Sequence, residues 1–172
     1  ARFYERMEIR DAIAYLRVIF QPDDDLALER ILNKPKRGIG LASLQSIHHL
    51  ARLESISLWL AIAKIIDTDE LRPAARKSLA KLINDFTRWR SMLDNSDHIE
   101  LAGIVLDESG YTEMLLKDKS PEAPGRLENL KELVSALEEF EGLGQFLEHI
   151  SLVMENAEDD TTEQISLMTL HA

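Results

Sequence analysis

A short turn that contains two glycines is the segment of the sequence best suited to bind an anion. It connects two segments of helical apolar spacing. Glycine adopts positive φ and lets a ligand approach the backbone closely. A helix that begins just after the turn directs unpaired N–H groups and the positive end of its dipole at an anion. The residues of this candidate phosphate clamp are Lys36, Arg37, Gly38, Ile39, Gly40 and Ser43.

The pattern predicts a helix-hairpin-helix-like turn at residues 34–43 that contacts the phosphates of a nucleic acid and reads no bases. The basic side chains would add charge, and the Ser43 hydroxyl would donate a hydrogen bond. A tight helix–helix turn with solvated basic residues would explain the same sequence, so this alternative stays open.

A second candidate site lies near the carboxyl end, where Thr169 and His171 follow the short apolar segment Gln164–Leu170. Functional residues of α/β folds often stand where a strand ends, although a strand end without a function would look the same. No metal site is expected, because the adjacent residues His48 and His49 face different ways on a helix. No catalytic residue or cofactor is expected within the chain. None of its seven glycines is followed by lysine, as a nucleotide-binding P-loop requires.

The charge of the chain limits where DNA could be bound. The formal net charge is −11, and sequence-independent binding of DNA depends on the neutralisation of phosphates by basic residues. Residues 1–52 hold nine Lys or Arg against seven Asp or Glu, whereas residues 53–172 hold eleven against twenty-four. Any contact with a polyanion is therefore expected in the first third of the chain and is expected to be weak.

Apolar spacing is helical over almost the whole chain. Helices are expected to end before Pro22 and at Lys34-Pro35, and to begin after Ser57 and at Pro73. Residues 155–163 look like an acidic linker. Only two short segments, Arg2–Tyr4 and Gln164–Leu170, suggest strands, and the chain offers them no partner strand.

The expected fold class is therefore all-α, with terminal strand stubs that belong to a neighbouring domain into which this one is inserted. The two ends should then lie close together. The chain has no cysteine and no apolar run long enough to span a bilayer, so a cytoplasmic protein without a membrane contact is expected.

Four segments in order along the chain resemble the UvrD/PcrA/Rep family of superfamily 1 DNA helicases. They are Phe3–Arg17, the stretch Asn33-Lys34-Pro35-Lys36-Arg37-Gly38-Ile39-Gly40, the helix Arg126–Leu133 and the segment Gln164–Ala172, which is similar to the opening of helicase motif V. Each segment alone is weakly diagnostic, but together they cover the chain at the spacing of the family.

The resemblance implies a division of the chain into residues 1–7, a stub of RecA-like domain 2A; residues 8–163, the helical accessory domain 2B; and residues 164–172, a second 2A stub. The parent would be an ATP- and Mg²⁺-dependent 3′-to-5′ DNA helicase. Domain 2B would hold duplex DNA through Gly38, Ile39 and Gly40 and swivel against the motor domains 1A, 1B and 2A. Thr169 and His171 would couple the single strand to ATP hydrolysis in the parent only. The alternative is an acidic helical module that docks a regulatory protein, or the motor core itself, with little DNA contact.

Overall fold

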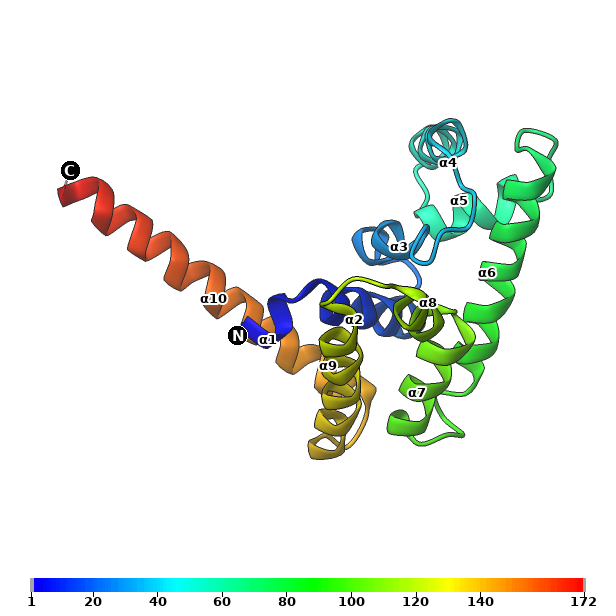
Figure 1. Cartoon of the computed structure of the whole chain (residues 1–172). Helices are drawn as coiled ribbons and strands as arrows, with labels where there is room; N and C mark the ends of the chain where they lie inside the picture. The colour runs from blue at the N-terminus through cyan, green and yellow to red at the C-terminus, as the bar shows by residue number, and fades with distance from the viewer. Residues whose placement is uncertain (1, 172) are drawn as a thin grey trace.

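A computed structural model describes the backbone of residues 2–171 and their side chains except those of residues 157–163 and 170–171. These residues form helices joined by short turns (Figure 1). The helices are α1 Arg2–Glu5, α2 Met7–Phe20, α3 Asp25–Ile31, α4 Leu41–Glu54, α5 Leu58–Ile65, α6 Pro73–Ser91, α7 His98–Glu108, α8 Tyr111–Lys117, α9 Ala123–Ala136 and α10 Leu143–His171, with the 3-10 turn η1 Leu137–Glu139 after α9. The expectation of an all-α fold is confirmed.

Helix α2 is the centre of the fold, because it is buried over most of its length and contacts α1, α3, α6, α7, α9 and α10. Its apolar residues pack into one continuous core with those of the surrounding helices. An aromatic cluster joins α2 to α6: the Tyr15 ring stacks on Phe86 at 5.8 Å between centroids, and Phe86 meets Trp89 edge-on at 4.9 Å. Trp89 is completely buried, which places it in the core.

The helix boundaries follow the local signals of the sequence. The Asp24 carboxylate accepts a hydrogen bond from the Ala27 N–H and caps α3, and Ser57 caps α5 through the Leu60 N–H. Pro73 occupies the first turn of α6, where the lack of an N–H group costs nothing. Such caps pair amides that would otherwise lack a partner within the helix.

The prediction of two terminal strand stubs is wrong, because both segments are helical. Residues Arg2–Glu5 form the short helix α1, and the segment Gln164–Leu170 belongs to α10, which is continuous through the expected acidic linker. A strand needs a neighbouring strand to pair its N–H and C=O groups. No strand occurs among residues 2–171, and a helix pairs these groups within the segment itself.

The ends of the chain do not meet as an insertion between paired strands would require. Tyr4 in α1 lines the same pocket as Ile150 and Met154, so α1 lies beside the part of α10 that packs on the body. The remainder of α10 projects away from the body, and the carboxyl end of the chain lies at its tip (Figure 1). None of the helices in residues 2–171 combines the length and the apolar character needed to cross a bilayer.

Candidate nucleic-acid interface

The predicted clamp forms the connection between α3 and α4. Gly38 adopts the left-handed conformation with φ of 73°, which favours glycine over residues with a side chain. Gly40 has ordinary extended angles, φ −81° and ψ 177°, and stands at the N-cap position of α4 without a side-chain cap. A Cβ atom built on either glycine meets no atom within 4 Å. Both glycines therefore offer open space above the backbone at the start of a helix.

The Ile39 side chain packs into the core and so anchors the middle of the turn. This side chain is only 4% exposed, while Gly38 and Gly40 on either side are exposed. The side chain of Asn33 holds the same residue through the backbone. The Asn33 Oδ1 atom accepts hydrogen bonds from the N–H groups of Arg37 and Ile39, and its Nδ2 donates to the Ile39 carbonyl at 2.6 Å. The path of the turn is thus fixed by one buried side chain and one amide.

Arg37 points into the protein, not toward solvent. Its Nη1 donates to the carbonyl oxygens of Ile31 and Leu32, at 2.6 and 3.0 Å, and its Nη2 donates to the Tyr15 hydroxyl at 2.6 Å. The two carbonyls stand at the carboxyl end of α3, where backbone acceptors lack partners within the helix. Arg37 therefore caps the carboxyl end of α3, and its guanidinium stabilises the fold through internal hydrogen bonds.

A buried polar network on α2 supports the approach to the turn. Asp11 is 1% exposed; its Oδ1 accepts from Arg30 Nε at 2.7 Å and lies 3.4 Å from Lys34 Nζ, and its Oδ2 accepts from the Tyr111 hydroxyl at 2.6 Å. One helical turn later, the Tyr15 hydroxyl donates to the Lys34 carbonyl. Burial first, and then the hydrogen bond to Asp11, raise the pKa of Tyr111 above its ordinary value, so Tyr111 stays a hydrogen-bond donor.

The other predicted clamp residues differ in how accessible they are. Lys36 is exposed and forms none of the ion pairs found among the described side chains. Ser43 lies in the first turn of α4 and is 9% exposed. Beside it, Leu41 is 73% exposed at the first position of the helix. The accessible groups of the turn are thus the backbone of the two glycines, the start of α4 and the Lys36 ammonium.

The second candidate site, at Thr169 and His171, does not lie beside the α3–α4 turn. Thr169 lies on the projecting part of α10, where its hydroxyl donates to the Ile165 carbonyl at 2.9 Å. The side chain of His171 lies outside the described residues. In Figure 1 the tip of α10 and the start of α4 stand at different ends of the molecule.

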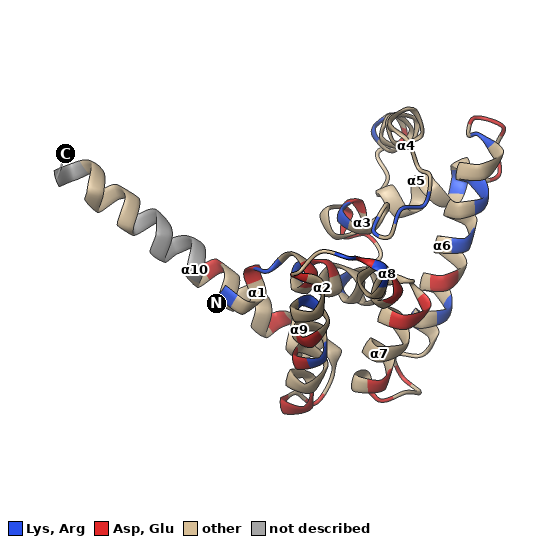
Figure 2. Cartoon of the chain, viewed as in Figure 1, with Lys and Arg blue, Asp and Glu red and all other residues tan. Residues whose placement is uncertain are grey.

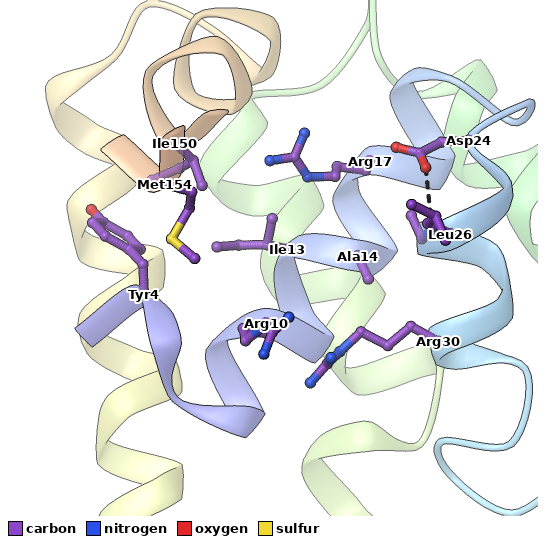
Figure 3. A pocket seen from close by; sticks show the side chains of 11 residues that line it. Tyr4, Arg10, Ile13, Ala14, Arg17, Asp24, Leu26, Arg30, Ile150 and Met154 are labelled. Carbon is purple, nitrogen blue, oxygen red and sulfur yellow. Dashed lines mark hydrogen bonds between the residues drawn. The ribbon is translucent and has the colours of Figure 1, made fainter. Parts of the chain in front are cut away.

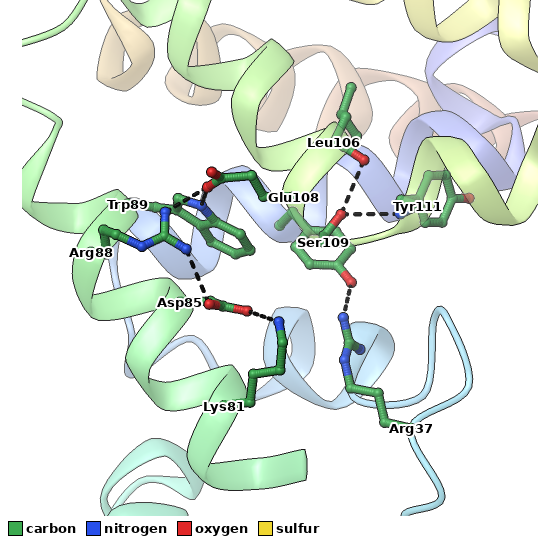
Figure 4. Close-up of polar contacts among 10 residues, drawn as sticks. Arg37, Lys81, Asp85, Arg88, Trp89, Leu106, Glu108, Ser109 and Tyr111 are labelled. Atoms are coloured by element: carbon green, nitrogen blue, oxygen red, sulfur yellow. Dashed lines mark hydrogen bonds and ion pairs between the residues drawn. The ribbon is translucent and has the colours of Figure 1, made fainter. Parts of the chain in front are cut away.

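Basic residues outside the first third of the chain gather on α6 (Figure 2). Residues 72–90 hold six Lys or Arg and one Asp. Several of these cations are paired: Lys81 Nζ lies 2.7 Å from Asp85, and Arg88 joins Asp85 at 3.1 Å and Glu108 (Figure 4). Hydrogen bonds from Trp89 and Arg88 lower the pKa of the Glu108 carboxyl. The contacts of Arg88 and Trp89 with Glu108 join α6 to α7, and all of these ion pairs leave less free positive charge on α6 than its sequence suggests.

Three supporting residues, Asp11, Tyr15 and Asn33, were not predicted as part of the site. Asn33 carried a signal, since it belongs to the stretch that resembles the helicase family. Asp11 and Tyr15 belong to another stretch that resembles the family, Phe3–Arg17, and both are buried on α2. Their partners lie 19 to 100 residues away along the chain, which local spacing does not predict.

Comparisons with known proteins identify the family. Residues 1–172 match the UvrD-like helicase C-terminal domain. The chain is 43% identical over 173 residues to a DNA helicase II of Rickettsia typhi, covering 99% of this chain and 26% of the relative. It is 37% identical over 186 residues to the ATP-dependent DNA helicase PcrA of Bacillus subtilis, covering 99% of this chain and 25% of that protein. The chain thus spans about a quarter of the length of these relatives, and it belongs to the UvrD-like helicase C-terminal domain family.

Proposed function

We propose that this chain is the non-catalytic accessory region of an ATP-dependent DNA helicase and that it holds duplex DNA at the α3–α4 turn. The backbone N–H groups of Gly38, Gly40 and the first turn of α4, which includes Ser43, would contact phosphate oxygens, with the Lys36 ammonium beside them. One observation carries the proposal: the turn is held in a fixed path from within the protein, while its two glycines present open backbone to solvent.

The role of Arg37 in this proposal is positioning. Its guanidinium is occupied by two α3 carbonyls and by Tyr15, so it would orient the turn without contacting DNA. Such contacts through backbone amides fix the position of a protein on a duplex and carry no sequence information. They suit an enzyme that must act on any sequence.

The wider organisation belongs to the same proposal. Residues 8–163 would form the accessory domain, flanked by segments of a neighbouring motor domain, and would regulate unwinding by changing its orientation against the motor. The chain contains no glycine followed by lysine, so it has no phosphate loop. ATP and Mg²⁺ would be bound by other parts of the parent, and Thr169 and His171 would act only there.

The substitution Gly40→Asp separates the clamp from a purely structural turn. Aspartate is a preferred N-cap residue, and its carboxylate would pair with the free amides at the start of α4. The added side chain meets open space, so stability should be equal or higher. The same carboxylate would occupy and repel the position of a phosphate. In the full-length protein we expect duplex unwinding to fall about tenfold or more, equivalent to about 1.4 kcal/mol or more of lost contact, while ATPase activity stimulated by single-stranded DNA is retained.

Gly142→Asp is the matched control. Gly142 precedes α10, the Phe146 N–H donates to its carbonyl, and a Cβ atom there also meets open space. The substitution is chemically the same and changes the net charge equally, so unwinding should be unaffected. If Gly40→Asp unwinds duplex DNA like Gly142→Asp, the turn has only a structural role. Loss of unwinding and ATPase in parallel would contradict the proposal equally.

A further inference from the structure

Three arginines surround a pocket that lies apart from the α3–α4 turn. The pocket has a volume of about 490 Å³ and lies between α1, α2, α3 and α10. Arg10 and Arg17 come from one face of α2, and Arg30 comes from α3 (Figure 3). Asp11 and Tyr15, which support the turn, point to another side of α2, since residues one apart on a helix face about 100° apart. The pocket therefore opens on a different side of α2 from the turn, and Arg30 is the residue that contributes to both.

The three guanidinium groups are only partly occupied by the protein. Arg10 is exposed and takes part in none of the hydrogen bonds or ion pairs found among the described side chains. Arg17 uses Nη1 to donate to the Ser151 hydroxyl at 3.1 Å. Arg30 uses Nε to pair with Asp11 at 2.7 Å, and its Nη2 lies 3.5 Å from the Met7 carbonyl oxygen. Guanidinium groups have five N–H donors each, so donors remain free on all three.

The lining places three arginines beside a single carboxylate. Asp24 is the acidic residue among the lining side chains, and its Oδ1 is used to cap α3. The remaining surface is largely apolar, with Ile13, Ile150 and Met154 on one side and Leu26, 82% exposed, on the other. In a chain of net charge −11, three cations around an apolar floor form a local surface of opposite charge.

We propose that this pocket binds an acidic peptide segment of a partner protein, with one apolar side chain on the floor and flanking carboxylates paired with the arginines. Arginine pairs with carboxylates through two parallel hydrogen bonds, and an apolar anchor beside them is a common means of peptide recognition. A nucleic-acid strand fits the pocket less well, because sugar and phosphate would leave the apolar side chains of the floor without an apolar partner.

A fluorescein-labelled peptide with a central phenylalanine flanked on both sides by aspartate and glutamate tests the proposal. Binding to the full-length protein would be measured by fluorescence anisotropy. We expect Arg10→Glu to weaken binding on the order of tenfold, the value of one charge-assisted hydrogen-bonded contact. Arg10 has no partner to lose, so the fold should be unchanged. Leu26→Ser, at a position that is also exposed, should weaken binding of the same peptide and should not affect a peptide with serine in place of phenylalanine.

Arg72→Glu is the matched control, since Arg72 is exposed at the start of α6 and the change in charge is identical. It should leave peptide affinity within about twofold, because exposed charges beyond a Debye length are screened. The proposal is overturned if the wild-type protein does not bind the acidic peptide, or if Arg72→Glu weakens binding as much as Arg10→Glu. It is also overturned if a DNA oligonucleotide displaces the peptide and loses affinity to Arg10→Glu in parallel, since the pocket would then bind nucleic acid. Gly40 does not line the pocket, so Gly40→Asp tests only the DNA contact at the turn. Arg10→Glu and Leu26→Ser test only the peptide site, and the two proposals can therefore fail separately.

Discussion

Replacement of Asn33 by alanine is expected to loosen the α3–α4 turn without unfolding the chain. The Asn33 side chain makes three hydrogen bonds to the turn, at 2.6, 3.2 and 3.3 Å. A neutral hydrogen bond contributes about 0.5–1.5 kcal/mol net. Two of the three are long and Asn33 is half-buried, so water can replace part of what is lost. We therefore expect the free energy of unfolding to fall by about 1–3 kcal/mol.

Amide hydrogen exchange gives the direct test. The N–H groups of Arg37 and Ile39 both donate to Asn33 Oδ1, so both should exchange faster in Asn33→Ala. The Leu44 N–H donates to the Gly40 carbonyl inside α4 and should change little, which makes it an internal reference. Asn95→Ala is a matched control, since the Asn95 side chain makes one long bond of 3.4 Å to the Ser91 carbonyl.

Asn33→Asp separates the acceptor from the donor of the side chain. Aspartate retains an oxygen for the two N–H groups but places a second oxygen against the Ile39 carbonyl, where Nδ2 donated. We expect protection of Arg37 and Ile39 to persist in part while stability still falls. Unchanged exchange of both amides in Asn33→Ala, or a loss of stability no larger than that of Asn95→Ala, would refute the assigned role of Asn33.

Further predictions concern Arg37, Lys36 and Tyr111. Arg37→Ala should lower the free energy of unfolding by about 1–3 kcal/mol and leave the log–log salt dependence of duplex binding nearly unchanged. Lys36→Ala should do the reverse and reduce that slope by up to about 0.9; a slope change in Arg37→Ala equal to that in Lys36→Ala would place the Arg37 guanidinium on DNA. Burial raises the pKa of Tyr111 above 10.0, so the folded protein keeps a proton that the unfolded chain loses, and stability should be full below about pH 10 and decline above it by up to about 1.4 kcal/mol per pH unit. Tyr111→Phe should reduce this decline in urea unfolding measured across alkaline pH, with Tyr15, whose pKa burial also raises, contributing the remainder; an unaltered decline would contradict the assignment.

Local signals in the sequence predicted most of the helices and the turn. Caps such as Asp24 and Ser57 and the glycine at position 38 act over a few residues, so their effects can be inferred from spacing alone. The network at Asp11 could not be inferred, because it depends on Tyr111, a hundred residues away. For the same reason the sequence predicted that Arg37 contacts phosphate. The residue type indicates a cation, but the packing of α3 against α2 determines which acceptors its guanidinium meets.

The strand prediction for Gln164–Leu170 was wrong for a different physical reason. A short apolar segment without Gly or Pro can form either a buried strand or a helix, and its periodicity does not distinguish them. Context decides, since a strand requires partners for its backbone groups. Among residues 2–171 there is no strand, and the segment continues α10. The same residues beside a neighbouring sheet would have other partners for their backbone groups.

The proposed contact with DNA can form even though the chain has a net charge of −11. Among the described side chains of residues 53–156 the carboxylates are mostly exposed, and their field falls off over a Debye length of about 8 Å at physiological salt. A backbone amide acts at hydrogen-bond distance and brings no counter-charge of its own. Arg37, Arg30 and Lys34 meanwhile use their charge on internal acceptors around the turn. A contact of this kind would be selected by shape and by fixed dipoles instead of net charge, so its affinity should depend on salt only weakly. A steep salt dependence, corresponding to several phosphates neutralised by Lys or Arg, would instead indicate the cationic face of α6 as the main contact.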